Sequence, residues 1–340
     1  MASKNFTILC LIFLMSLSIF TSNVMAVSPK CEEESKEGNC ANDKHKALSL
    51  KVIAIVSILV TSIIGVCLPL VTRCVKAFSP QKNLFLIVKA FSAGIILGTG
   101  FMHVLPDSFE MLSSSCLPDF PWHFFPFSGL LAMFSAIVTM MIDSIATSVT
   151  NNKKGLHVAA INANGDEEKA GDDKLEHEKS LSRYRVIAMV LELGIIVHSI
   201  VIGLSLGVSN NPCTIKGLVA ALCFHQMFEG MGLGGCILQA DYKFIKKTIM
   251  VFFFAVTTPA GIAVGILLSN SYKENSPKAL VTTGLLNASS AGLLIYMALV
   301  DLLAADFMGP KLQGSIKLQL KSYVAVFLGA CGMSVLAIWA

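Results

Sequence analysis

Charged residues are scarce in this 340-residue chain, because Asp, Glu, Lys and Arg make up only 14% of it and hydrophobic residues make up 54%. A soluble globular protein normally carries about a quarter charged residues, so this composition excludes an ordinary soluble domain. Apolar stretches of about twenty residues follow one another along the chain, and each could cross a hydrocarbon core of roughly 30 Å. The sequence therefore predicts an all-α polytopic membrane protein.

The apolar stretches predict eight membrane-spanning helices, called span 1 to span 8 below, at about 48–72, 84–108, 127–149, 184–207, 216–239, 248–270, 279–303 and 320–339. Polar residues inside these helices concentrate in spans 4 and 5. Three spans thus lie on either side of a polar central pair. This order suggests a 3+2+3 bundle with an inverted repeat, which is a common plan among transporters.

The N-terminal residues 1–26 resemble a secretory signal peptide, with Lys4, a short apolar run and small residues at a cleavage site that ends at Ala26. An uncleaved first helix is the alternative. Cleavage would leave residues 27–47 as an extracellular segment in front of an eight-helix domain at 48–340. Cys31 and Cys40 would then lie on the side of the membrane where disulfides persist.

Lys and Arg are absent from the loop after span 2 and from residues 208–215, whereas the loops after spans 1, 3, 5 and 7 carry several. Cytoplasmic loops are enriched in Lys and Arg, so this asymmetry places the N-terminus outside. With eight spans the C-terminus is extracellular too. Cys116 and Cys213 then lie on the outer face, where they could pair with each other or remain free thiols.

One long polar segment, at 150–183, separates spans 3 and 4. Its mixed charge and its Gly and Asn residues predict a flexible cytoplasmic loop. The lysines of this loop are candidate ubiquitin acceptors, and His157 and His177 could contact a metal ion transiently or simply lie in a solvated loop.

Spans 4 and 5 carry an unusual set of polar residues in apolar surroundings. The stretch LELGIIVHSIVIGLSLG contains His198 and Ser199, and the stretch LCFHQMFEGMGLGG contains His225, Gln226 and Glu229. A charged side chain at the bilayer centre costs at least about 2.5 kcal/mol on insertion scales, so it requires a partner inside the protein or a water-filled path. His225 and Glu229 are four residues apart and therefore share one face of a helix.

The depth of these residues indicates that they meet. At about 1.5 Å per residue, His225 lies roughly 14 Å below the outer end of span 5, and His198 lies roughly 15 Å below the outer surface. Two imidazoles and the Glu229 carboxylate on adjacent antiparallel helices predict a divalent-metal site, although either histidine alone could be a hydrogen-bonded packing residue. Without a thiolate, this set favours Zn²⁺ and Fe²⁺, with Mn²⁺ and Co²⁺ possible, over Cu⁺.

Span 2 ends in a second group of polar residues. His103, Asp107 and Glu110 follow the spacing i, i+4, i+7 and therefore line one stripe near the outer surface. Pro106 has no N–H for the carbonyl of Met102 and so can bend the helix. The stripe could be an entrance that concentrates cations, or it could be a polar helix end that meets water.

The inner halves of spans 3 and 4 each contain one acidic residue. Asp143 lies in MMIDSIATS, and Glu192 lies in LELGIIVHS. Either residue could mark the exit of a metal path, or it could be a polar group at a helix end.

Features of two other functional classes are missing. The H-E-x-x-H motif places a glutamate directly after the first histidine, but Gln226 follows His225, so this zinc-protease motif is absent. A different intramembrane metal-dependent hydrolase remains the alternative function. A metal sensor would more naturally carry a larger soluble domain than this chain has. We therefore expect a metal transporter and no enzyme.

The motifs HSIVIG in span 4 and HQMFEG in span 5 resemble the signature of the ZIP (ZRT/IRT-like) family of metal-ion transporters. The stretches GIILGTGFMHVLPDSFEML, RYRVIAMVLELGIIVHS, CTIKGL and AGLLIYMALVDLLAA are most similar to its plant iron-regulated (IRT-type) branch. The resemblance implies eight spans, both termini outside and a homodimer in the lipid bilayer of the plasma membrane. It also implies import of Fe²⁺, Zn²⁺ and related ions such as Mn²⁺, Co²⁺ and Cd²⁺, with no resident cofactor and no nucleic-acid partner.

The resemblance also assigns residues to roles. It places the central metal site at His198, Ser199, His225, Gln226 and Glu229, and it makes His103 and Asp107 contributors from span 2 or a gate. Ile202 and Thr258 stand where some relatives carry glutamate, so a complete two-metal centre is not implied. The loop at 150–183 lacks the His-rich run that many relatives carry there.

Overall fold

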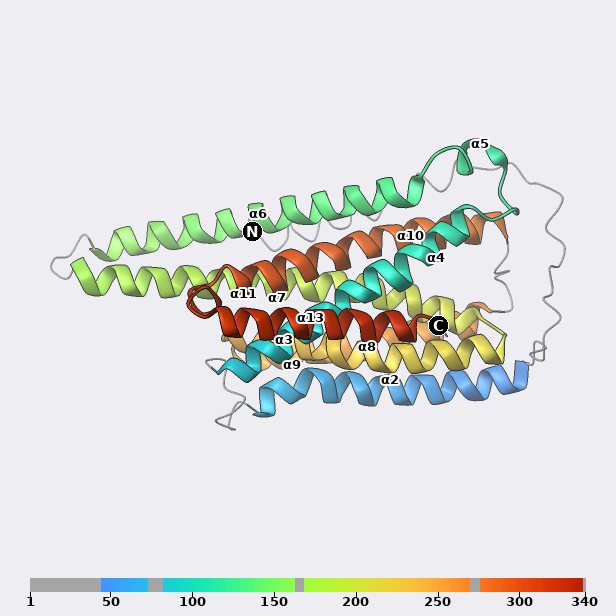
Figure 1. Ribbon diagram of the computed structural model, residues 1–340, viewed down its shortest axis with the longest axis horizontal. Helices are drawn as coiled ribbons and strands as arrows, with labels where there is room; N and C mark the ends of the chain where they lie inside the picture. The colour runs from blue at the N-terminus through green and yellow to red at the C-terminus, as the bar shows by residue number, and fades with distance from the viewer. Residues whose placement is uncertain (1–43, 73–81, 163–167, 270–275, 339–340) are drawn as a thin grey trace.

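The computed structural model describes residues 44–72, 82–162, 168–269 and 276–338. The predicted signal peptide, Cys31 and Cys40 lie outside the described residues. Helices account for all the regular secondary structure of the described residues: α2 (Lys44–Thr72), α3 (Asn83–Thr99), η2 (Gly100–Val104), α4 (Leu105–Leu112), α5 (Asp119–Trp122), α6 (Phe127–Asn162), α7 (Glu168–Val208), α8 (Pro212–Gln239), α9 (Phe244–Leu268), α10 (Pro277–Tyr296), η3 (Met297–Ala304), α11 (Ala305–Phe307), α12 (Pro310–Gln313) and α13 (Ile316–Leu336). The long helices lie side by side in one bundle (Figure 1).

Seven stretches among the described residues are long and apolar enough to cross a membrane: Lys44–Val71, Asn83–Leu112, Phe127–Val149, Leu181–Val208, Phe244–Leu268, Pro277–Phe307 and Ile316–Leu336. They agree with predicted spans 1 to 4 and 6 to 8. The helix at predicted span 5, α8, has 28 residues but is less apolar, because it carries His225, Gln226 and Glu229. Since α8 packs against α2, α3, α7 and α13, it has no need of a fully apolar surface.

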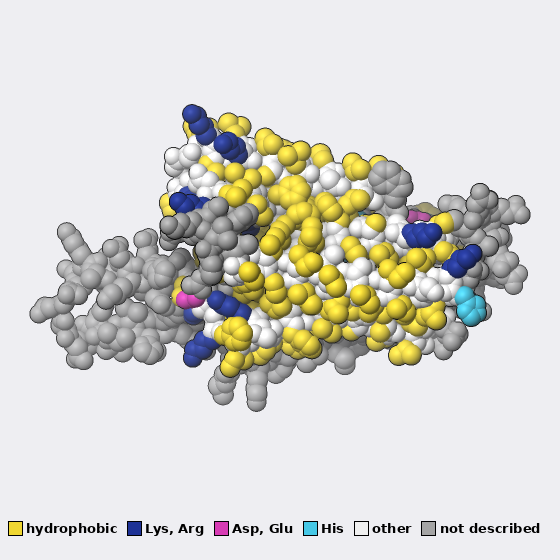
Figure 2. Space-filling model, turned by 90° about the horizontal axis from the view of Figure 1, so that it is seen from below, with side chains coloured by type: hydrophobic (Ala, Val, Ile, Leu, Met, Phe, Trp, Pro, Cys, Tyr) yellow, Lys and Arg dark blue, Asp and Glu magenta, His cyan; other side chains and the backbone are white. Residues whose placement is uncertain are grey.

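The sides of the bundle are apolar. Figure 2 shows one such face, on which hydrophobic side chains form a broad band and Lys and Arg lie toward its two ends. Large side chains that point outward include Val52 and Val56 of α2, Phe252 and Phe253 of α9, and Phe327 of α13. Exposed apolar surface of this extent is stable only in contact with lipid or another apolar partner, so the protein is a multi-pass membrane protein.

Spans 2 and 7 are each interrupted by a π-helical turn. In span 2, η2 lies just before Pro106, and the N–H of Leu105 donates to the carbonyl of Gly100 five residues back. Because Pro106 lacks an N–H, it cannot continue the regular pattern, and the π turn absorbs this break. Such turns are often found at functional sites, and η2 contains His103.

The packing partners of the two halves correspond to each other. α2 packs on α8 while α9 packs on α7, and α3 packs on α13 while α10 packs on α6. If span 1 is exchanged with span 6, span 2 with span 7, span 3 with span 8 and span 4 with span 5, the α2–α8 contact becomes the α9–α7 contact. The same exchange turns the α3–α13 contact into the α10–α6 contact. The π turns of spans 2 and 7 obey the same exchange. This arrangement agrees with the predicted 3+2+3 inverted repeat.

The segment predicted to be a flexible loop, 150–183, is largely helical, so that prediction is wrong in its secondary structure. α6 continues to Asn162, α7 begins at Glu168, and both extend beyond the other helices on the left of Figure 1. The segment is rich in Glu, Lys, Ala and Leu, which are strong helix formers. Extending an existing helix also avoids the cost of a new nucleus. The side chains of His157 and His177 are outside the described part.

Candidate metal site

Helix α8 begins at a well-defined cap that sets the position of its polar residues. The side chain of Asn211 accepts hydrogen bonds from the N–H groups of Cys213 and Thr214 at 2.9 and 3.4 Å, and Pro212 occupies the first turn. An Asn cap followed by Pro is a favourable start for a helix. Cys213 and Cys116 are both disulfide-bonded, which excludes the alternative that they are free thiols.

Three predicted site residues meet in the centre of the bundle. His198 of α7, together with His225 and Glu229 of α8, offers one ligand atom per residue, and these atoms all lie within 4.8 Å of one another. The ring centroids of His198 and His225 are 5.8 Å apart. All three side chains are buried. The geometry therefore contains the two-imidazole, one-carboxylate group that helix spacing and depth predicted.

His103 adds a third imidazole from a third helix. The π turn η2 brings its ring centroid to 6.3 Å from that of His225, and the side chain is buried. His103 is not part of the three-residue group defined above. It lies beside that group. From His103, the stripe of span 2 continues to Asp107 and Glu110.

The polar atoms of this centre lack the partners that buried groups normally have. Nε2 of His103 and of His198, both ring nitrogens of His225 and both carboxylate oxygens of Glu229 have no hydrogen-bond partner among the described residues. Native structures satisfy most buried polar atoms, and each one left unsatisfied costs about 1–3 kcal/mol. This concentration of buried nitrogen and oxygen atoms without partners fits a bound cation, because imidazole nitrogens and a carboxylate can coordinate one ion together.

Ser290 of α10 orients His198. Its hydroxyl shares a hydrogen bond of 3.0 Å with Nδ1 of His198 and so leaves Nε2 for the centre. A partner on the second ring nitrogen is typical of metal-binding histidines. Sequence reasoning missed Ser290, because nothing in span 7 marks this serine among the polar and small residues around it.

Ser199 and Gln226 are also buried, and the Ser199 hydroxyl and both amide atoms of Gln226 lack partners within the described chain. Each follows its histidine directly and therefore projects about 100° further round the helix. Ile202 packs in an apolar cluster with Leu206 and Ile262, so it supplies no ligand to the centre. The two polar residues thus flank the three-residue group.

The remaining predicted residues lie outside the centre. Asp107 is half-buried one turn beyond His103, and Glu110 is exposed near it. Asp143 is half-buried and accepts a 3.3 Å hydrogen bond from the Tyr296 hydroxyl. These acidic groups are not brought together with the histidines.

Glu192 is half-buried near the inner end of span 4 and interacts by charge with Lys246. The nearby turn between α8 and α9 is fastened by Tyr242, whose hydroxyl donates to the carbonyl of Arg185 at 2.7 Å. Burial is the largest cause that raises the pKa of Tyr242, and Glu192 raises it further. Tyr242 therefore stays a neutral donor that holds this turn against α7.

Asp301 on η3 is an acidic residue that sequence reasoning missed. Its side chain is only 2% exposed, and its Oδ2 atom has no hydrogen-bond partner in the described part of the protein. Asp143 and Arg183 act on it electrostatically. A single carboxylate in the apolar stretch MALVDLLA is the signal that could have drawn attention to it.

Comparisons with known proteins identify the family of this chain. The family model described as ZIP zinc transporter matches residues 48–337. The chain is 60% identical to Fe(2+) transport protein 1 of Arabidopsis thaliana over the full length of both chains. It is 59% identical to "Probable zinc transporter 10" of Arabidopsis thaliana, over 98% of this chain and 97% of that protein. It is 53% identical to Fe(2+) transport protein 1 of Oryza sativa subsp. japonica, over 91% and 88%. The chain therefore belongs to the ZIP zinc transporter family.

Proposed function

We propose that this protein imports divalent transition-metal ions toward the cytosol, with Fe²⁺ and Zn²⁺ as the leading substrates and Mn²⁺, Co²⁺ and Cd²⁺ as further ones. The observation that carries this proposal is the buried group of His198, His225 and Glu229, whose ligand atoms lie within 4.8 Å of one another. The names of the relatives, which are iron and zinc transport proteins, support divalent-metal transport. They give no support to the alternative of an intramembrane hydrolase.

The donor set suits an ion that must be released again. Three protein ligands leave a coordination position open, whereas structural zinc sites are closed by four. Two neutral imidazoles and one carboxylate bind borderline divalent ions without the thiolates that would select Cu⁺. We assign Ser199 and Gln226 to the flanks of this site and His103 to its outer side. The metal ion is cargo, and no resident cofactor enters the proposal.

Purified protein in liposomes tests this function against the others. Influx of Fe²⁺ or Zn²⁺ into the liposomes supports transport. Cleavage of lipid or peptide without influx would instead indicate a hydrolase, and metal binding with neither activity would indicate a sensor. Competition between Fe²⁺, Zn²⁺, Mn²⁺ and Cd²⁺ in cells that lack their own importers then ranks the substrates.

We expect the outer stripe to act as an electrostatic entrance. Asp107→Asn combined with Glu110→Gln should raise the half-saturating metal concentration by up to about tenfold at low ionic strength, because the two carboxylates raise the local cation concentration. High salt should shrink the difference, since exposed charges are screened over about 8–10 Å. Uptake measured at two ionic strengths checks this expectation. Equal half-saturation in wild type and variant at low salt would contradict it.

We expect Ser290→Ala to raise the half-saturating metal concentration by about tenfold, because loss of a partner on the second histidine nitrogen typically lowers metal affinity 10- to 100-fold. Ser289→Ala is the matched control, since the Ser289 hydroxyl only donates to the carbonyl of Leu285 within the same helix. Metal uptake normalised to protein at the membrane compares the two. An equal effect of both substitutions would rule out an orienting role for Ser290.

We infer that Asp143 and Glu192 lie on the inner part of the metal path. Asp143 lies close enough to Asp301 for its charge to act on that carboxylate, so the two carboxylates could receive a cation together. Glu192 lies apart from them, near Lys246. Uptake by Asp143→Asn and Glu192→Gln, each compared with wild type, tests the two positions separately.

The same proposal includes the membrane arrangement. α8 crosses the membrane as the fifth of eight spans, the signal peptide 1–26 is removed, and both termini are extracellular. The protein lies in the plasma membrane as a homodimer, and lysines within 150–183 accept ubiquitin from the ubiquitination machinery. The absence of Lys and Arg from the loop after span 2 and from residues 208–215 supports this orientation. Epitope tags placed directly after residue 26 and at the C-terminus, detected on intact cells, test it.

A further inference from the structure

A buried lysine lies near the inner end of the bundle and has no role in the metal centre. Lys89 of α3 is only 3% exposed. Its Nζ atom is 2.9 Å from Oδ2 of Asp306 on α11 and 2.9 Å from Oε1 of Gln239 on α8. It also lies 5.6 Å from the ring centroid of Tyr184 on α7. A buried charge must be paired, and here the pairing joins four helices at one point.

One partner of Lys89, Gln239, lies on the same face of α8 as the metal-centre residue Glu229. On α8, Glu229, Gly232, Cys236 and Gln239 follow the spacing i, i+3, i+7, i+10, which places them on one face. Glu229 belongs to the metal centre, and Gln239 binds Lys89. One stripe of α8 therefore runs from the metal centre to the buried lysine.

The facing helix follows this stripe along its whole length. At the outer end His103 lies beside His225, with ring centroids 6.3 Å apart. In the middle, a Cβ added to Gly232 would lie 3.5 Å from Cδ1 of Ile96 and 3.7 Å from Cβ of Ser92. At the inner end Lys89 contacts Gln239. Span 2 and α8 thus form two walls of one path.

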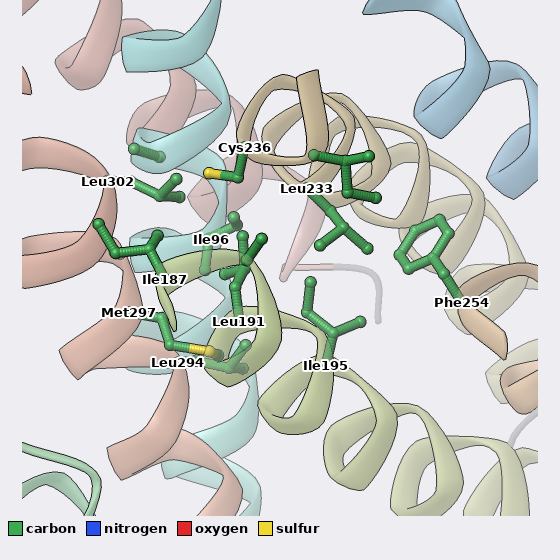
Figure 3. Close-up of a cluster of buried hydrophobic side chains, with 14 of the residues drawn as sticks. Ile96, Ile187, Leu191, Ile195, Leu233, Cys236, Phe254, Leu294, Met297 and Leu302 are labelled. Atoms are coloured by element: carbon green, nitrogen blue, oxygen red, sulfur yellow. The ribbon is translucent and has the colours of Figure 1, made fainter. Parts of the chain in front are cut away.

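Apolar side chains fill the space between the metal centre and Lys89. Ile96, Leu191, Leu233, Cys236 and Leu302 belong to one buried cluster, and none of them is more than 1% exposed. Figure 3 shows these five side chains close together, contributed by α3, α7, α8 and η3. Removing water from around a divalent ion in such surroundings is very costly. The ion can therefore leave inward only when this cluster opens.

We propose that Lys89, Asp306 and Gln239 form an inner latch that holds α3, α8 and α11 together at the cytoplasmic end and must open before the metal ion is released. This proposal rests on the proposed function for the identity of the ion that passes the latch. While it is closed, these contacts of Lys89 hold the inner ends of α3, α8 and α11 together and keep the apolar cluster shut. Separation of α3 from α8 removes the Gln239 contact and opens the apolar cluster in the same movement.

Cys236 is a native reporter for this opening, because it is a free thiol that is fully buried between the metal centre and the latch. The experiment uses inside-out membrane vesicles and a charged, membrane-impermeant thiol reagent. Reagent added to the vesicle exterior reaches the cytoplasmic face, and the rate at which Cys236 is modified is measured. Other reactive thiols are removed by replacing these residues with serine: Cys67, Cys74, Cys223 and Cys331.

Lys89→Met should raise the rate of Cys236 modification at least about tenfold, because removing one partner of a buried ion pair is strongly destabilising to the closed arrangement. Gln239→Leu should raise it about threefold, since it removes one hydrogen bond and leaves the Lys89–Asp306 ion pair intact. The charge exchange Lys89→Asp with Asp306→Lys should return the rate toward that of wild type. Lys243→Met, at an exposed lysine near the same end, is the control and should leave the rate unchanged.

Wild-type modification rates in both Lys89→Met and Gln239→Leu would overturn the latch. A rapid rate in the charge-exchange protein would also overturn it, because the restored ion pair should close the path. Gln239→Leu leaves no buried charge unpaired and so keeps the test valid if Lys89→Met fails to reach the membrane. Absence of metal uptake by the wild type would contradict the proposed function and not the latch, since thiol modification is measured without transport.

Discussion

Glu229→Gln is expected to lower metal uptake at subsaturating concentration at least about 100-fold, which corresponds to about 2.7 kcal/mol. Glu229 is the only carboxylate in the group of three buried ligands. Glutamine has nearly the same shape but no charge, so the change removes the anion that offsets the charge of a divalent ion in a low-dielectric site. Losing one member of a buried charge pair typically costs 2–5 kcal/mol. Surface-normalised uptake of radioactive zinc and iron gives the measurement.

Glu110→Gln is the comparison for this substitution, because it makes the same chemical change at an exposed glutamate of the outer stripe. We expect Glu110→Gln to change uptake far less than Glu229→Gln. His198→Ala should resemble Glu229→Gln, since it removes a ligand from the facing helix. Uptake by Glu229→Gln at the wild-type rate, with equal protein at the membrane, would show that the ion does not pass this group.

Gly265→Val is expected to prevent correct folding and delivery to the membrane. α7 and α9 approach so closely that a Cβ on Gly265 would lie 2.6 Å from the carbonyl oxygen of Leu204 and 2.7 Å from Cα of Gly207. Backbone atoms cannot move aside as a flexible side chain can, so the two helices must separate. Overpacking of a tight core usually costs about 1–3 kcal/mol and can cost more. Cell-surface labelling and the thermal stability of solubilised protein measure the loss.

Gly129→Val is the control, because a Cβ added to Gly129 of α6 meets nothing within 4 Å. Both substitutions add the same β-branched side chain to a helix, so they share the same intrinsic propensity cost. We expect Gly129→Val to reach the membrane and to transport at close to the wild-type rate. Similar delivery of the two variants would mean that the α7–α9 contact tolerates separation.

Much of the architecture could be predicted because it follows from local properties of the chain. The length of an apolar stretch and the thickness of the bilayer together define a span, and seven of the eight predicted stretches qualify by length and apolarity. Helical periodicity placed His225 and Glu229 on one face, and depth counting paired them with His198. The structure brings these three residues together.

Other features depend on which helices become neighbours, and sequence spacing carries little information about that. Ser290 lies 92 residues from His198, and Asp306 lies 217 residues from Lys89. No local pattern links such pairs. The prediction of a loop at 150–183 failed for a related reason, since polarity was taken as disorder although the residues favour helix and continue α6 and α7.

The membrane class, the positions of the spans and the residues able to hold a divalent ion follow from local sequence, because bilayer thickness and the 3.6-residue period act on neighbouring residues. The folded chain was needed to show that Ser290 orients His198 and that Lys89 meets Asp306 and Gln239. It was also needed to show that an apolar cluster lies between the metal centre and this lysine. The fit between whole helix surfaces, rather than any single stretch of sequence, selects these neighbours.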